Sequence, residues 1–323
     1  MVTEAPEHCY RHPATETSVH CTRCDRPICP KCMIPAAVGF HCPECVTEGR
    51  RTTRTARTIY GGRIRPGETP GMVTRTLIAI NVVVFIIACA DGANVLTGSG
   101  SSSLFRHLAL IPPAVGNGEW WRLFTAAFLH FGIFHIGFNM YALWIFGPPL
   151  EAAMGKVRFV ALYLLAGIAG NLLSAGLGPL NETAAGASGA IFGLFAALYV
   201  VARHRNFNTQ PIAFTIVANL VFTFAVSNID WRGHVGGLVV GAAIAAIIAF
   251  APRGPHRDRI QAAGILGVCA VMVVGGLLAV HRVNHRCGQV AVAPPTLASG
   301  PDLASCIIYD RPAVRNAELN LSR

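Results

Sequence analysis

Seven apolar runs constrain the fold of this 323-residue chain more than any other feature. Most of them approach the roughly 20 residues that a helix needs to cross a bilayer, and the fourth and fifth are shorter. With 53% hydrophobic and 13% charged residues, the chain lacks the polar surface that a soluble domain needs. We therefore expect an α-helical multi-pass membrane protein with seven spans. The runs lie at about residues 75–91, 126–147, 157–177, 188–202, 211–227, 234–251 and 260–280.

Basic residues predict how these helices are oriented, because Lys and Arg concentrate on the cytoplasmic side of a membrane. They mark alternate connections, at 50–75, 156–158, 203–205 and 253–259, so we expect a cytosolic N-terminus in the cell membrane. The tail, residues 281–323, is then extracytoplasmic. The same topology accounts for the net charge of +10, so no nucleic-acid partner is expected. Cys287 and Cys306 in the tail could pair as a disulfide there.

Residues 1–48 contain seven of the eleven cysteines and predict a small metal-binding module. Four pairs with two intervening residues supply eight ligands, enough for two structural Zn²⁺ ions with four ligands each. A segment this short buries little apolar surface, so metal would supply its folding energy. Disulfides are the alternative, which the regular spacing disfavours. The ligand pairs are Cys9/His12, Cys21/Cys24, Cys29/Cys32 and Cys42/Cys45.

Two points about this N-terminal region stay open in the sequence. His8, His20 and His41 lie close enough in the chain to substitute for one of the ligands. The sequence also does not say whether the module recruits a cytosolic protein partner. Residues 49–74 follow as a basic linker rich in Arg, Thr, Gly and Pro, which predicts a flexible tether near anionic lipid headgroups.

Polar side chains within the spans are costly in a bilayer and indicate a buried site. His130, His135 and Asn139 belong to the second span, and the last two share one helical face. Ser188 begins the fourth span and His234 begins the sixth, so all five fall near the outer side. Each taken alone is explained by structural hydrogen bonding. In the long outer connection 92–125, Trp121-Arg122 is typical of an element in the headgroup region.

Two glycine-containing motifs surround the last two of these residues. Gly186-Ala187-Ser188-Gly189 leads from a polar loop into an apolar run, where small residues permit close approach to the serine and the helix N-terminus offers free N–H groups. His234, Gly237 and Gly241 lie on one stripe, which lets another helix pack closely. Small residues at a helix interface would produce the same tetrapeptide, so neither motif is specific alone.

Together these motifs resemble the rhomboid family of intramembrane serine proteases over roughly residues 75–251. The resemblance implies a six-helix core, and residues 252–280 would add a seventh helix. The N-terminal pairs resemble B-box zinc modules, which implies that the first and third pairs share one ion and the other two pairs share the second. The last pair departs from that pattern, which usually ends in histidines. The motifs are Trp121-Arg122, His130-xxxx-His135-xxx-Asn139, Gly186-Ala187-Ser188-Gly189 and His234-Val235-Gly236-Gly237-xxx-Gly241.

The rhomboid resemblance implies a role for each site residue. Ser188 is the nucleophile, His234 is its general base, and Phe192 stacks on that imidazole. His135 and Asn139, with the backbone N–H of Ser188, stabilise the oxyanion. His130 has a structural role, and the remaining supporting residues are Gly186, Gly189, Gly237 and Gly241.

The implied activity is cleavage of transmembrane protein substrates in the lipid bilayer, without a catalytic cofactor. The alternative is a rhomboid-like pseudoprotease that binds or escorts membrane clients. A third interpretation, a transporter with a histidine proton relay, leaves the motif around Ser188 unexplained.

Overall fold

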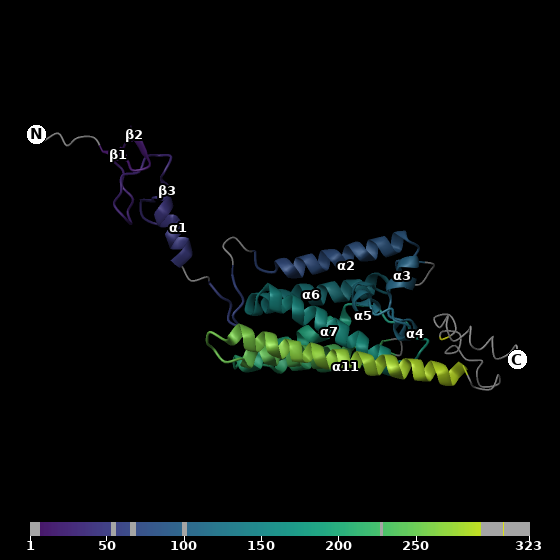
Figure 1. The fold of residues 1–323 in the computed structure, drawn as a ribbon. Helices are drawn as coiled ribbons and strands as arrows, with labels where there is room; N and C mark the ends of the chain where they lie inside the picture. Colours follow the sequence, from purple (N-terminus) through teal and green to yellow (C-terminus); the bar gives the residue numbers. More distant parts are fainter. Residues whose placement is uncertain are drawn as a thin grey trace, which may run out of the picture. The chain divides into compact units, whose positions relative to one another are not determined.

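The computed structural model describes residues 7–52, 56–64, 69–98, 102–226, 229–291 and 306. The chain divides into two compact units, Met1–Ala56 and Arg57–Arg323 (Figure 1).

The N-terminal unit consists of two antiparallel hairpins and one helix. Strand β1 (His8–Cys9) pairs with β2 (His12–Glu16), strand β3 (Ile34–Pro35) pairs with β4 (Phe40–His41), and α1 (Pro43–Thr52) follows. Its buried cluster contains six cysteines and a single aliphatic residue, Ile28. Because so little apolar surface is buried, the hydrophobic effect alone stabilises this unit weakly.

The second unit is mainly helical, and each of the seven predicted spans contains a helix. The predicted start of the second span at residue 126 is wrong, because the chain bends there and the long helix begins at Gly132. Four helices are long and apolar enough to cross a membrane: α2 (Met72–Ala90), α7 (Lys156–Leu177), α10 (Trp231–Phe250) and α11 (Arg257–Ala291). A bent pair, Arg122–Phe128 with α6 (Gly132–Met154), passes as one further span, with 92° between its parts. The helices α8 (Ser188–His204) and α9 (Gln210–Ala225) are apolar but shorter. The predicted fold class, a helical multi-pass membrane protein, is confirmed.

Helices α7, α8 and α10 pack against one another at the centre of this unit. Glycines make this packing close: a Cβ on Gly237 would lie 1.9 Å from the carbonyl oxygen of Gly189, and one on Gly241 would lie 2.3 Å from the Cα of Gly193. The α8 and α10 backbones are therefore in direct contact, which fixes the relative position of the two helix beginnings. On one side α2 packs beside α6, and α11 packs along α7 and α10 (Figure 1).

A buried carboxylate joins α2 to α6. Glu151 accepts hydrogen bonds from the backbone N–H groups of Val73 and Thr74 and from the Thr74 hydroxyl, at 2.9–3.0 Å. The first N–H groups of a helix have no partner within it and carry a partial positive charge. The carboxylate of Glu151 therefore caps α2 from a neighbouring helix.

The long connection between α2 and α6 is ordered by short helices and a buried arginine. It contains α3 (Ser103–Leu108), α4 (Pro112–Gly116), α5 (Arg122–Thr125) and η1 (Ala126–Phe128). Arg122, expected near the headgroups, is instead buried, because it pairs with Glu119 at 2.7 Å and donates to the Ala109 carbonyl at 2.7 Å. Trp121 is 52% exposed, and its position in the headgroup region stays a prediction.

The sequence predicted a flexible tether over residues 49–74. This prediction is wrong for the segment around Tyr60, which packs within the second unit. Tyr60 is buried, donates its N–H to the Ala153 carbonyl at 3.2 Å and lies 3.2 Å from His204 through its hydroxyl. Arg57 and Arg158 both bind the carboxylate of Asp258. This basic segment therefore binds residues of the same unit. A count of its charges does not reveal these contacts.

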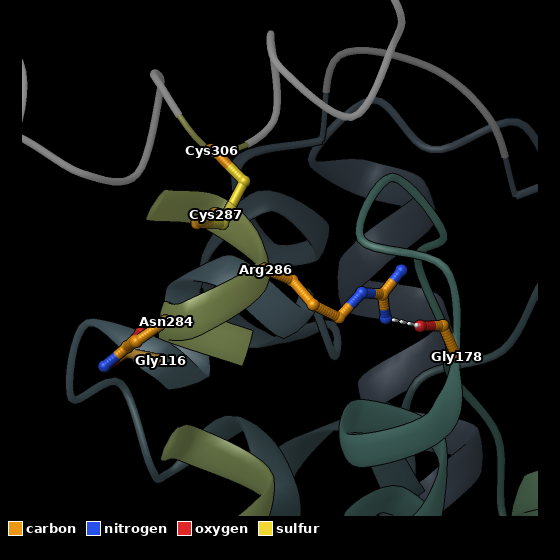
Figure 2. The surroundings of a disulfide bond; sticks show 6 residues. All are labelled: Gly116, Gly178, Asn284, Arg286, Cys287 and Cys306. Carbon is orange, nitrogen blue, oxygen red and sulfur yellow. Dashed lines mark hydrogen bonds between the residues drawn. A yellow bond between two sulfur atoms is a disulfide. The ribbon is translucent and has the colours of Figure 1, made fainter. Parts of the chain in front are cut away.

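Helix α11 continues to Ala291, beyond the predicted end of the seventh span at residue 280. Figure 2 shows its C-terminal end, where Arg286 donates to the Gly178 carbonyl at 2.8 Å and Asn284 to the Gly116 carbonyl at 3.2 Å. Next to them Cys287 forms a disulfide with Cys306, so the predicted pairing is confirmed. Otherwise the tail beyond Ala291 lies outside the described residues.

Candidate functional site

Ser188 is the first residue of α8, and the loop before it is held by backbone hydrogen bonds. Leu110 and Ala184 exchange two such bonds, and the N–H of Gly186 donates to the Ala126 carbonyl at 2.9 Å. Gly186 has a φ of 136°, which favours glycine. A Cβ there would also lie 2.6 Å from the His135 ring. Gly186 therefore leaves space for His135 beside the serine.

His135 lies on α6 with its Nε2 directed toward this space. Its Nδ1 accepts a hydrogen bond from the Phe131 N–H at 3.2 Å, so in neutral imidazole the proton is on Nε2. An ideal Cβ on Gly186 would be 2.8 Å from that Nε2 and 3.7 Å from the Ser188 Oγ. A donor and a hydroxyl thus both lie close to the same glycine.

His234 lies in the first turn of α10 and stacks on an aromatic ring of α8. Its ring centroid is 4.2 Å from that of Phe192, with 13° between the planes. Phe192 is one turn after Ser188, and His234 is one turn before the contact of Gly237 with Gly189. The predicted stacking partner and close helix contact are both present.

The remaining polar residues of α6 and the loop before it hold the backbone around the site. Asn139 is buried and donates to the His135 carbonyl at 2.9 Å, leaving its second amide hydrogen free of that bond. His130 is 1% exposed, and its Nε2 accepts from the N–H of Ala187 at 3.5 Å. His130 thereby anchors the residue before the serine, as the structural role predicts.

Asp230 makes no hydrogen bond to His234 in the described part of the chain. It caps α10 by accepting from the Arg232 N–H at 3.1 Å, and its other oxygen accepts from the Ser174 hydroxyl. The hydroxyl of Ser188 makes no hydrogen bond to another described residue, and so none to His234. Helix packing brings the two to one end of the α8–α10 pair.

One contact of the site was not expected from the sequence. Thr223, on α9, is buried with its Oγ1 2.8 Å from the Nδ1 of His234. A signal was present, because Thr215, Asn219 and Thr223 recur at intervals of four and form a polar stripe on an otherwise apolar helix.

The N-terminal unit contains two four-residue groups with ligand atoms within 4.8 Å of one another. In the first, the Nδ1 of His12 lies 3.3–3.8 Å from the sulfur atoms of Cys32, Cys29 and Cys9. Metal–sulfur bonds of about 2.3 Å give a tetrahedron edges of about 3.8 Å, so the donors fit one ion. The first and third pairs form one group and the second and fourth the other, as expected. The groups are Cys9/His12/Cys29/Cys32 and Cys21/Cys24/Cys42/Cys45.

The environments of these thiols differ: Cys9 is favoured as the thiolate that a metal requires, whereas burial and hydrogen bonds with neighbouring cysteines raise the pKa of the Cys32 thiol to about 11 and that of the Cys45 thiol to about 12. Burial opposes ionisation of Cys9, but hydrogen bonds from the backbone of Cys29 and Arg11 lower the pKa of its thiol to about 6. All seven cysteines of this unit are free of disulfides. His8, His20 and His41 belong to neither group, and His20 instead pairs with Glu7 and Asp25. The disulfide alternative and the substitute ligands are therefore wrong for this fold.

The second unit is thus a polytopic helical protein that gathers a serine and two histidines at one end of its central helices. The rhomboid domain family model matches residues 117–250, which include every residue of this site. The chain belongs to the rhomboid family.

Relatives of known name support the same assignment. Over 219 residues, 66% of this chain, it is 39% identical to the rhomboid protease GluP of Bacillus subtilis, covering 41% of that protein. It is 33% identical over 188 residues to rhomboid-like protease 1 of Toxoplasma gondii, covering 52% of this chain and 61% of the relative. Identity to the rhomboid protease AarA of Providencia stuartii is 26% over 234 residues, 64% of this chain and 80% of the relative. The chain thus spans less than two thirds of the length of GluP and of rhomboid-like protease 1.

Proposed function

We propose that this protein is an intramembrane serine endopeptidase that cuts membrane proteins within or next to their transmembrane segments. The observation that carries the proposal is the convergence of Ser188, His135 and His234 around Gly186 and the Gly189–Gly237 contact. Relatives named as proteases support the reaction class. The pseudoprotease alternative is disfavoured because both the serine and the histidine of a catalytic dyad are present.

In the proposed reaction, the Oγ of Ser188 attacks the carbonyl carbon of the scissile peptide bond while its proton passes to the Nε2 of His234. The imidazolium returns this proton to the leaving amine, and water then hydrolyses the acyl ester by the same route. The hydrogen bond from Ser188 to His234 would form with substrate present, since catalytic hydrogen bonds are often long without it. Asp230 is engaged elsewhere, which supports a dyad.

Three donors suit the negative charge that develops on the substrate oxygen. The N–H of Ser188 belongs to the first turn of α8 and has no partner within the helix. His135 presents its Nε2–H over Gly186, and Asn139 retains an amide hydrogen one turn along α6. Donors held rigidly in a site of low dielectric stabilise such an oxyanion strongly, because they need not reorient during the reaction.

We further propose a cytosolic N-terminus and an extracytoplasmic site in the cell membrane. The alternation of basic connections supports this orientation, and the Cys287–Cys306 disulfide suits an oxidising compartment. For the N-terminal unit, residues 1–48, the four-ligand geometry supports two structural Zn²⁺ ions. The region from 75 to 251 would be the catalytic core, with 49–74 the linker and 252–280 the seventh span.

The experiment is cleavage of a model transmembrane substrate by the purified full-length chain in liposomes. Ser188→Ala and His234→Ala should each abolish cleavage, and the double variant should be little worse, because the pair acts as one unit. A serine-directed fluorophosphonate should label the wild type and not Ser188→Ala.

The matched control is His281→Ala, which changes an exposed histidine of α11 and should cleave normally. Undiminished cleavage by Ser188→Ala would refute the assignment to this site. A wild type that neither cleaves rhomboid-type substrates nor takes the probe would favour the pseudoprotease.

A further inference from the structure

Helix α9 packs on the core through the partly buried Ile216 and Leu220 and contains one buried residue. Among its described side chains only Thr223 is buried, at 2% exposure, while most of the others are exposed or half-buried apolar groups. That single buried group is polar, and it lies against His234 of α10. A buried hydroxyl that is not fully hydrogen-bonded destabilises a fold, so the bonds of Thr223 define its chemistry.

The hydrogen bonds of Thr223 assign the proton positions. Its Oγ1 lies 2.7 Å from the Asn219 carbonyl oxygen and 2.8 Å from the Nδ1 of His234. Two oxygens at that separation require a hydrogen between them, and a carbonyl can only accept, so the threonine hydrogen points to Asn219. Thr223 has no second hydrogen, and the Nδ1 of His234 must therefore be the donor to Oγ1. In neutral imidazole this leaves Nε2 unprotonated.

An unprotonated Nε2 is the form that a general base needs. Among the described residues no carboxylate hydrogen-bonds His234, and Asp230, four residues before it, is bound to Ser174 and Arg232. Stacking on Phe192 fixes the plane of the imidazole but does not select which nitrogen carries the hydrogen. Thr223 is the only described side chain that hydrogen-bonds His234.

We propose that Thr223 is a positioning residue that holds His234 in the Nδ1–H tautomer with Nε2 available to the serine. This rests on the proposed protease function. The Asn219 carbonyl takes part by orienting the threonine hydrogen. A neutral hydroxyl thereby fills the place that an acidic residue has in a catalytic triad. For the enzyme to be active, the last turn of α9 must then stay beside the first turn of α10, so that Thr223 remains within hydrogen-bond distance of His234.

The test compares Thr223→Val, Thr223→Ser and Thr215→Val with the wild type. Valine keeps the shape of threonine but accepts no hydrogen bond, whereas serine keeps the hydroxyl. Thr215→Val is the matched control, since Thr215 lies on the same helix and its exposed hydroxyl donates only to the Pro211 carbonyl. We expect Thr223→Val to lower kcat roughly tenfold with KM unchanged, in line with the loss of one buried hydrogen bond.

Thr223→Ser should restore kcat to within about twofold of the wild type, since the hydroxyl remains. A second measurement reports the tautomer directly: ¹⁵N NMR of histidine-labelled protein in detergent micelles, with His234→Gln used to assign the signal. The wild type should show a protonated Nδ1, and Thr223→Val should show a mixture or the opposite tautomer. Thermal unfolding of each variant separates loss of fold from loss of the hydrogen bond.

The possible results separate this inference from the proposed function. If the wild type cleaves and Thr223→Val has the same kcat and the same ¹⁵N spectrum, the inference is wrong while the protease function stands. A Thr223→Ser variant as slow as Thr223→Val would also contradict it, because the hydroxyl would then be irrelevant. If the wild type itself neither cleaves nor reacts with a fluorophosphonate, the proposed function fails, and the NMR measurement still tests the tautomer.

Discussion

The two histidines beside Ser188 hold their protons on opposite nitrogens relative to the site. His135 accepts at Nδ1 from Phe131 and so presents a donor at Nε2. The hydrogen bonds of Thr223 leave His234 with an acceptor at Nε2. One backbone N–H and one threonine thus give identical side chains different chemistry, which is what a site with both an oxyanion donor and a base requires.

This division predicts graded effects of substitution. His135→Ala and Asn139→Ala should each lower kcat by roughly 10²–10³, the usual cost of one oxyanion donor, while Ser188→Ala abolishes cleavage. The reason is that the Ser188 N–H and one side-chain donor remain in either variant. Steady-state cleavage in liposomes measures this, with intact labelling of folded protein by a fluorophosphonate as a control. A variant that carries both His135→Ala and Asn139→Ala and still has the wild-type kcat would contradict the oxyanion role.

At the scale of elements, the sequence predicted the helices well because a bilayer span needs a long apolar run, whatever its neighbours. The pairing of Cys9/His12 with Cys29/Cys32 was also predictable, through resemblance to a known module. The contact of Thr223 with His234 was not predictable, because the polar stripe on α9 shows which face is polar but not which helix that face meets. The burial of Arg122 depended in the same way on Glu119 and a distant carbonyl.

The N-terminal unit gives an element-scale prediction about metal. Residues 1–56, expressed alone, should fold only with Zn²⁺ and contain about two ions per chain, because ligand bonds replace an apolar core. Circular dichroism with and without a chelator, together with metal analysis, measures both. Cys24→Ser should lower the content to about one ion.

His41→Ala is the matched control for that substitution. His41 lies next to the ligand Cys42 in the sequence but belongs to neither cluster, so this variant should keep both ions. A metal-free segment that stays folded, or loss of an ion in His41→Ala, would overturn the assignment. Deleting the unit should leave cleavage largely intact, since every candidate catalytic residue belongs to the second unit.

At the scale of the whole molecule, the C-terminal end of α11 links two connections of the second unit. Its last turns donate through Asn284 and Arg286 to carbonyls in the two connections that precede α5 and α8 (Figure 2). Cys287, Val283 and Leu180 share a small buried cluster with Cys306. The seventh helix therefore contacts the loop that leads to Ser188. Apolar periodicity could not predict the hydrogen bonds in this contact, because polar side chains make them.

The disulfide tests the orientation of the entire chain. With a cytosolic N-terminus and seven spans, Cys287 and Cys306 lie outside the cell, where a disulfide persists. In intact cells a membrane-impermeant maleimide should label neither cysteine before reduction and both after it, while Cys287→Ser/Cys306→Ser stays unlabelled throughout. Labelling without a reductant would contradict the disulfide. Failure to label intact cells after reduction, with labelling once the membrane is permeabilised, would place the tail in the cytosol and reverse the proposed topology.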